Sequence, residues 1–231
     1  MNTVGGTSLY SENEILNQLK LNRSNDFSRL LEENGIKING ISFNDNHNYY
    51  DISADITIDN SFYKLKKGVN KKGSRWEKGN KVTVKDRKKH LIDYYGFAGF
   101  GDKCHRGHLL ARQLKDYVEF TDFNFSKNNP NNIYPQWINA NLNKAYRSEI
   151  YGQAHFENKI IEALEKNKTI TYAVKPIFTK SNKYFPVGNL IISILEDDVE
   201  KGDMRIIVSG DKKEEFCVLI PNYLDTDILP E

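Results

Sequence analysis

The sequence predicts an α+β fold in which a central antiparallel β-sheet is flanked by helices. Three observations lead to this prediction. Apolar residues recur at helical spacing near the N-terminus, they alternate with polar residues in the segments that follow, and the last part of the chain is a series of short β-rich segments. Helices and strands therefore occur in blocks rather than as repeated strand–helix–strand units, and this order favours antiparallel pairing.

The N-terminal part is predicted to contain one or two short helices followed by a hairpin. Residues 11–34 have helical apolar spacing that is interrupted around residues 22–25. Residues 36–43 and 49–58 alternate between apolar and polar positions, and the segment between them is rich in asparagine and aspartate. Two alternating segments joined by a turn of this composition are typical of a β-hairpin.

Downstream of the hairpin, residues 66–80 are expected to form a surface loop and residues 82–84 a brief strand. Residues 128–132 are a strong loop signal, and residues 137–164 are predicted to be mostly helical, with a new start near Gly152. The strands expected after Lys168 cover residues 169–178, 190–195, 205–209 and 216–220.

Net charge is only +2 over 231 residues, but the charges are unevenly distributed. One segment is strongly basic and contains Lys64, Lys66, Lys67, Lys71, Lys72, Arg75, Lys78, Lys81, Lys85, Arg87, Lys88 and Lys89. A basic stretch of this kind fits a surface that contacts phosphate, although a solvated face has the same composition. Charge alone leaves both interpretations open.

Several classes of protein are excluded by composition. No apolar run approaches the roughly 20 residues that a membrane helix needs, so no membrane segment is expected. The two cysteines, Cys104 and Cys217, exclude a disulfide-dense scaffold while permitting a single bridge. Residues 1–10 lack a basic segment followed by an apolar stretch, so no conventional secretory signal is expected there.

Two short motifs are the densest chemical signal. Residues 104–110 read Cys-His-Arg-Gly-His-Leu-Leu, and residues 132–136 read Asn-Ile-Tyr-Pro-Gln, followed by Asn141. This pair resembles the ββα-metal DNA/RNA non-specific endonucleases, in particular the streptococcal DNA-entry nucleases and related exported bacterial nuclease toxins. Their pattern is Asp-Arg-Gly-His upstream of Asn-Ile-x-x-Gln-x-x-x-x-Asn. The second motif matches throughout, whereas His105 stands where that family has aspartate.

The resemblance covers roughly residues 56–222 and implies a ββα-metal nuclease domain at residues 56–231. Residues 1–55 are then an N-terminal helical segment together with the start of the sheet, without an assigned function. The motif Ser74-Arg75-Trp76 is similar to the place where these nucleases hold an arginine for the scissile phosphate. Residues 174–178 and 218–222 resemble strand motifs of the streptococcal branch.

The resemblance implies that His108 is the general base and that Asn141 is a single protein ligand of Mg²⁺, with Mn²⁺ able to substitute. Both roles are physically reasonable. Histidine, with an ordinary pKa near 6.5, can take a proton from water at neutral pH. Mg²⁺ prefers oxygen ligands and keeps several of its waters, so one amide carbonyl can suffice.

Arginine is suited to phosphate because its donors form a fixed fork, so Arg75 and Arg106 are expected to bind the reacting phosphate. A carboxylate is expected to orient the metal-bound waters. Glu149 fits by its helical spacing from Asn141, whereas Glu157 fits the streptococcal branch by its interval from Gly152-Gln153, and both stay candidates.

The remaining site predictions are less direct. Asn132 is expected to shape the loop that presents the helix, and Gln136 is expected to bind substrate or a metal-bound water. Lys72 and Lys78, in the basic segment, are further candidates for substrate binding. An alternative interpretation places Cys104, His105 and His108 in a zinc site with Cys217 or His155, because thiolate and imidazole suit zinc.

The predicted function is a metal-dependent endonuclease that cleaves DNA to 5′-phosphate products with little sequence preference, and RNA stays open as a second substrate. The resemblance to exported toxins adds two expectations: a cognate immunity protein as partner, and secretion or delivery to target cells by a route that uses no signal peptide. The alternative is a nucleic-acid-binding protein on a nuclease scaffold that no longer cleaves, an idea that the His105 departure motivates.

Overall fold

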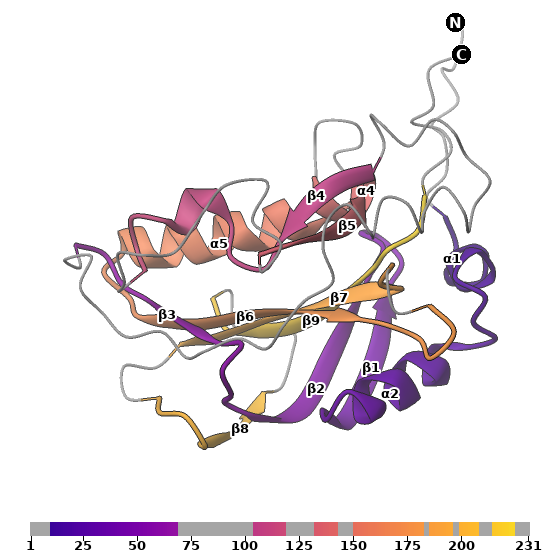
Figure 1. Ribbon diagram of the computed structural model, residues 1–231, viewed down its shortest axis with the longest axis horizontal. Coiled ribbons are helices and arrows are strands. Elements are labelled where there is room, and N and C mark those ends of the chain that lie inside the picture. The colour runs from indigo at the N-terminus through magenta and orange to yellow at the C-terminus, as the bar shows by residue number, and fades with distance from the viewer. Residues whose placement is uncertain are drawn as a thin grey trace, which may run out of the picture.

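The computed structural model describes residues 10–68, 104–118, 132–142, 150–182, 185–195, 199–207 and 214–224. Its framework is a seven-stranded sheet with helices on both faces. Figure 1 shows helix α5 (Gln153–Glu165) and the small pair β4 (Cys104–His108) and β5 (Ile133–Trp137) above the sheet, with helix α2 (Ser24–Glu33) below it. The predicted α+β class with a central antiparallel sheet is confirmed.

The two N-terminal helices form where the apolar spacing predicts them. Helix α1 (Glu12–Gln18) begins at a capping box, in which the Ser11 hydroxyl accepts from the Glu14 N–H and the Glu14 carboxylate accepts from the Ser11 N–H. Helix α2 follows the break in the pattern. Gly35 comes just after α2 with a φ of +79°, a left-handed conformation in which glycine is unstrained.

The sheet is antiparallel in all the pairings between its described strands. Strands β1 (Lys37–Asn44) and β2 (Tyr49–Thr57) form the predicted hairpin. The order is β1-β2-β9-β7-β6-β3, and β8 also pairs with β2. The other strands are β3 (Tyr63–Leu65), β6 (Ile170–Ile177), β7 (Gly188–Leu195), β8 (Met204–Ile207) and β9 (Phe216–Pro221).

Strands β6, β7 and β9 are apolar nearly throughout because both of their faces are covered. On β7, Leu190 and Ile192 belong to the core shared with the N-terminal helices, whereas Ile191 belongs to the core beneath α5. Since neighbouring residues on a strand point to opposite faces, each of these strands contributes to both cores.

The segment around β5 differs from the prediction. Residue 137 was expected to begin a helix, but Trp137 ends β5, and the helix that follows, α4 (Ile138–Asn141), has only four residues. A proline inside the segment argues against a central strand. Pro135 is tolerated here because, among the described strands, β5 pairs with β4 alone and therefore needs no N–H on its other edge.

Helix α5 restarts after Gly152 as predicted. The expected strand at residues 82–84 and most of the expected loop at residues 66–80 lie outside the described residues. The expected division between residues 55 and 56 falls inside β2, and α1, α2 and β1 precede it. A separate role for that segment stays a prediction.

Asn222, just beyond β9, connects the β4–β5 pair to the large sheet through hydrogen bonds. Its side chain is fully buried, and its Oδ1 accepts from the backbone N–H of Trp137 at 2.8 Å. Its Nδ2 donates to the carbonyls of Pro186 at 2.9 Å and Pro135 at 3.5 Å. One side chain therefore satisfies backbone groups of two separate segments.

Replacing Asn222 with Ala should lower the free energy of unfolding by about 2–4 kcal/mol, because buried backbone groups lose their partners. Urea denaturation followed by circular dichroism measures the change. The matched control is Asn17→Ala, at an exposed position on α1. Equal stability of the Asn222 and Asn17 variants would contradict this anchoring role.

Candidate active site

The candidate site is built on β4, β5 and α4. The antiparallel register places His105 opposite Gln136, Gly107 opposite Tyr134 and His108 opposite Ile133. Directly opposed residues share a face and neighbours alternate, so His105 and His108 leave β4 on different faces. The pairing brings together the two sequence motifs that are far apart in the chain.

Gly107 is required by packing rather than by backbone conformation. A Cβ placed on it would lie 2.3 Å from Oε1 of Gln136 and 2.9 Å from the ring of Tyr134. Both of those side chains are buried and come from β5. The glycine between Arg106 and His108 therefore lets the two strands carry large side chains on this face.

Asn132 holds the ends of the two strands together. It is fully buried, its Oδ1 accepts from the Leu110 N–H at 2.8 Å, and its Nδ2 donates to the Leu110 carbonyl at 2.9 Å. Its backbone carbonyl accepts from the Leu109 N–H. These contacts hold the chain just after His108, and the predicted role of Asn132 in the loop that presents the helix stays a prediction.

His108 is the last residue of β4 and is half-buried. Burial lowers the pKa of its imidazole below the ordinary 6.5, because desolvation disfavours the charged ring. The ring is then neutral at pH 7 and able to accept a proton. Its backbone carbonyl accepts a hydrogen bond from Nε2 of Gln153 at 2.6 Å.

A buried polar network lies between His108 and α5. Gln153 Nε2 also donates to Glu157 Oε1 at 2.7 Å, and the Tyr134 hydroxyl donates to Gln153 Oε1. The Glu157 carboxylate accepts further from Gln113 Nε2 at 3.1 Å and the Tyr172 hydroxyl at 3.3 Å. Among the described residues, Glu157 therefore meets His108 through Gln153 rather than directly.

Burial raises the pKa of Glu157 from 4.5 to about 7, although the hydrogen bonds from Gln153, Tyr172 and Gln113 oppose this rise. The two sequence motifs predict no role for Gln153, Tyr134, Tyr172 or Gln113. The one available signal was the spacing of Gln153 and Glu157, which puts both side chains on one face of a helix.

The start of α5 packs tightly against α4. Gly152 is the N-cap of α5, and a Cβ on it would lie 2.6 Å from the carbonyl oxygen of Asn139 and 2.7 Å from that of Leu142. Only glycine allows this close approach. As a result, the N-terminus of α5 contacts α4.

Asn141 ends α4 and lies within hydrogen-bonding distance of His105, with 3.1 Å between Asn141 Nδ2 and His105 Nδ1. Its Oδ1 has no hydrogen-bond partner among the described residues. A half-buried amide carbonyl without a protein partner is the type of oxygen that Mg²⁺ accepts as a ligand. The residues present therefore fit a magnesium site with one protein ligand.

Gln136, predicted to bind substrate or a metal-bound water, lies inside the β4–β5–α4 unit. It is fully buried, and its Nε2 donates to the Ala140 carbonyl at 2.9 Å, which ties β5 to α4. A side chain without exposed surface does not reach a polymeric substrate in this conformation. Its Oε1 has no partner among the described residues, so an acceptor for a water is still present.

Other predicted site residues lie outside the described part of the chain. These are Arg75, Lys72, Lys78 and Glu149, and for Arg106 the structure describes the backbone but not the side chain. Their roles stay predictions, as does the choice between Glu149 and Glu157.

The zinc interpretation receives no support. No group of three or more histidine, cysteine or acidic side chains suited to a metal occurs among the described residues, which include all five proposed ligands. Cys104 and Cys217 are not joined in a disulfide, and Cys217 is buried in the sheet. Burial raises the pKa of the Cys217 thiol, so it stays protonated and is a poor ligand.

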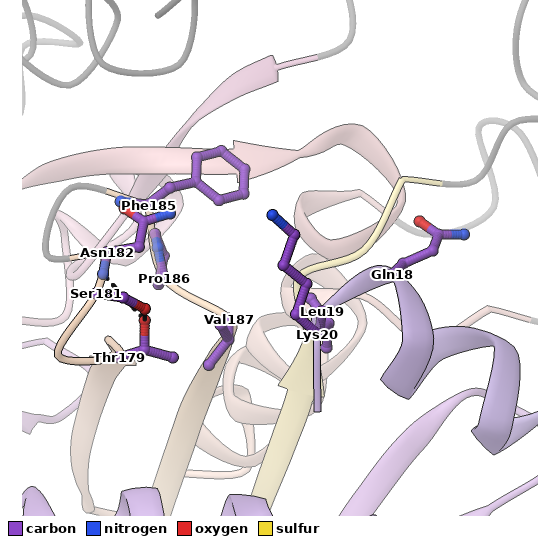
Figure 2. A pocket seen from close by; sticks show the side chains of 9 residues that line it. All are labelled: Gln18, Leu19, Lys20, Thr179, Ser181, Asn182, Phe185, Pro186 and Val187. Atoms are coloured by element: carbon purple, nitrogen blue, oxygen red, sulfur yellow. Dashed lines mark hydrogen bonds between the residues drawn. The ribbon is translucent and has the colours of Figure 1, made fainter. Parts of the chain in front are cut away.

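A surface pocket lies elsewhere in the described structure. Figure 2 shows Lys20, which follows α1, on one side, and Thr179 and Ser181, which follow β6, on the other. Phe185 also lines it and packs its ring against Trp137 at the end of β5. None of the predicted site residues lines this pocket.

A β-pair followed by a short helix, with histidine on the first strand and asparagine on the helix, defines the ββα-metal class of fold. The family model of the DNA/RNA non-specific endonucleases matches residues 34–208, and the chain belongs to this family. Membership makes it a nuclease, that is, a hydrolase. The match begins next to β1 and ends before β9.

A solved structure confirms the fold. The chain is similar to NucA from Streptococcus agalactiae with magnesium ion bound, at 17% identity and a TM-score of 0.52, covering 89% of this chain and 92% of that one. The same NucA with no metal bound matches at 18% identity and a TM-score of 0.49, covering 87% and 90%. Within the described residues, no helix is long and apolar enough to cross a membrane.

The raised pKa of Glu157 predicts a pH-dependent stability. The folded state retains the Glu157 proton up to about pH 7, whereas the unfolded chain releases it near the ordinary value. The stabilisation is therefore complete at low pH and is lost as the pH rises through 7, by up to about 3 kcal/mol.

Urea denaturation of the wild type and of Glu157→Gln across pH 4 to 8 measures this contribution. The variant has no proton to lose at this position, so its stability should fall less as the pH rises. In this variant the NH₂ group of the new glutamine faces the NH₂ group of Gln113, and two donors cannot bond to each other. We therefore also expect a loss of stability that is the same at every pH. Parallel pH profiles for the two proteins would show that Glu157 is ionised throughout.

Proposed function

We propose that this chain is a metal-dependent endonuclease that hydrolyses the phosphodiester bonds of DNA, and of RNA, without sequence preference. The observation that carries the proposal is the β4–β5–α4 unit, which combines a neutral half-buried His108 with an Asn141 amide whose oxygen has no partner among the described residues. Membership in the DNA/RNA non-specific endonuclease family supports the substrate class.

Each residue has a defined task in this proposal. His108 takes a proton from the attacking water, and Asn141 offers its Oδ1 to Mg²⁺, for which Mn²⁺ can substitute. When bound, the cation supplies positive charge that stabilises the pentacoordinate phosphate and the leaving oxygen. The magnesium ion of the Streptococcus agalactiae NucA structure supports this choice of metal.

Positively charged side chains bind the substrate in this proposal. Arg75 and Arg106 bind the reacting phosphate, and Lys72 and Lys78 bind the flanking backbone, because phosphate contacts carry no sequence information. Glu157 holds Gln153 and through it the backbone of His108, and Glu149 is the remaining candidate for orienting metal-bound waters. The products carry 5′-phosphates, as the family resemblance implies.

Replacing His108 with Ala should lower the rate of plasmid cleavage in Mg²⁺ by about 100-fold or more, since general bases contribute on that scale. Agarose digestion of plasmid, linear DNA and RNA, with Mg²⁺, Mn²⁺ or EDTA, measures the rate. The matched control is His47→Ala, which removes a histidine from the turn between β1 and β2 and should keep most of the activity.

Full activity in the His108 variant would reject the assignment of the general base. A wild type that binds DNA in a salt-sensitive manner but shows no EDTA-sensitive cleavage would instead support the alternative of a binding protein on a nuclease scaffold.

A second proposal concerns the biological role. We infer that the nuclease is the toxic domain of an antibacterial effector that is secreted or delivered to target cells and neutralised by a cognate immunity protein. The support is the resemblance of the two motifs to exported nuclease toxins.

Expression in the bacterial cytoplasm should then stop growth and degrade the chromosome, whereas the His108→Ala variant should be tolerated. Relief of toxicity by the product of a neighbouring gene, with a complex isolated by gel filtration, would identify the partner. Normal growth of cells that accumulate active wild-type nuclease would contradict the toxin role.

A further inference from the structure

Residue 105 links the strand of the proposed general base to the proposed metal ligand. His105 lies on β4, opposite Gln136 of β5, and its Nδ1 is 3.1 Å from Nδ2 of Asn141 at the end of α4. Both side chains are partly buried. The contact spans the β4–β5–α4 unit and joins residues from its first strand and its helix.

It matters which end of the Asn141 amide faces His105, because the two ends have different hydrogen-bonding and metal-binding properties. The carbonyl oxygen has lone pairs for a cation, whereas the NH₂ group only donates hydrogen bonds. The two ends are nearly equal in size, so a hydrogen-bond partner rather than packing decides their orientation. In the structure the NH₂ end of Asn141 faces the ring, and because an NH₂ group only donates, His105 Nδ1 is the acceptor of this contact.

The backbone of Asn141 is already fixed by other contacts. The carbonyl of Ala140 accepts from Gln136 Nε2 at 2.9 Å, and the Leu142 N–H donates to the Ile138 carbonyl at 2.8 Å. The preceding residues Asn139 and Ala140 are buried. Rotation of the Asn141 amide about its last side-chain bond is therefore the freedom that His105 restricts.

We propose that His105 is a positioning residue, which holds the NH₂ end of Asn141 and thereby presents its carbonyl oxygen to the divalent cation. This rests on the proposed function, in which Asn141 is the metal ligand. Aspartate, the residue that the motif leads one to expect here, is also an acceptor. The departure at position 105 thus keeps the hydrogen-bond polarity while it removes a negative charge.

Mn²⁺ binding to the purified protein without DNA, followed by the electron paramagnetic resonance signal of free Mn²⁺, tests the proposal independently of activity. His105→Ala should weaken Mn²⁺ binding by about 10-fold or more, the usual effect of losing a group that orients a ligand. His105→Phe keeps a ring but has no acceptor, and should show the same loss. His105→Asp should restore binding to the wild-type level or better.

Two controls separate positioning from a general effect on the fold. Cys104→Ala changes the neighbouring residue on the opposite face of β4 and should leave the affinity unchanged. Asn141→Asp has an oxygen at both ends, so in that background His105→Ala should weaken Mn²⁺ binding far less. Thermal unfolding without metal checks that each variant is folded.

The outcomes distinguish this inference from the proposed function. Equal losses on His105→Ala in the wild-type and the Asn141→Asp backgrounds would show that His105 acts on the fold, and would overturn the inference. A wild type that cleaves DNA in Mg²⁺, with unchanged Mn²⁺ affinity after His105→Ala, would overturn the inference and leave the nuclease assignment intact. A wild type that binds no Mn²⁺ would overturn the metal site itself, and with it this inference.

Discussion

The pairing of β4 with β5 is the interaction on which the site depends, because it aligns two motifs that are distant in the chain. It sets His108 at the end of one strand and leads the other strand directly into α4 and Asn141. A two-stranded sheet is marginal by itself. This pair is held by Asn132 at one end and by Asn222 at the other, where its backbone joins the large sheet. The rigidity of the site therefore comes from buried asparagine side chains as much as from apolar packing.

Between α5 and the β-pair lies a buried polar network, at a place where apolar packing would give a more stable fold. Glu157 is buried with its carboxylate bonded to Gln113, Gln153 and Tyr172, and its pKa of about 7 reflects the cost of keeping charge there. Through Gln153 the network reaches the carbonyl of His108. The network costs stability and restrains the backbone of His108, the proposed general base, and such a cost is common at functional sites.

The departure of His105 from the family pattern has a physical interpretation. The His105 Nδ1 lies where it can accept the hydrogen bond from Asn141 that a carboxylate would accept, so the amide orientation is kept. The site loses a negative charge that would attract the cation. If Asn141 is the single protein ligand, as we propose, affinity for the metal depends strongly on the orientation of its amide.

The sequence by itself determined the helices at the N-terminus, the hairpin of β1 and β2, the strands after residue 168 and the restart at Gly152, because these follow from local periodicity and turn residues. The two motifs likewise determined the family and nominated His108 and Asn141. Tertiary structure alone decided that residues 133–137 form a strand in spite of Pro135, that Gln136 is buried, and that Glu157 reaches His108 through Gln153. Each of these features depends on residues that are distant in the sequence and close in the fold. Local sequence patterns contain no information about those neighbours.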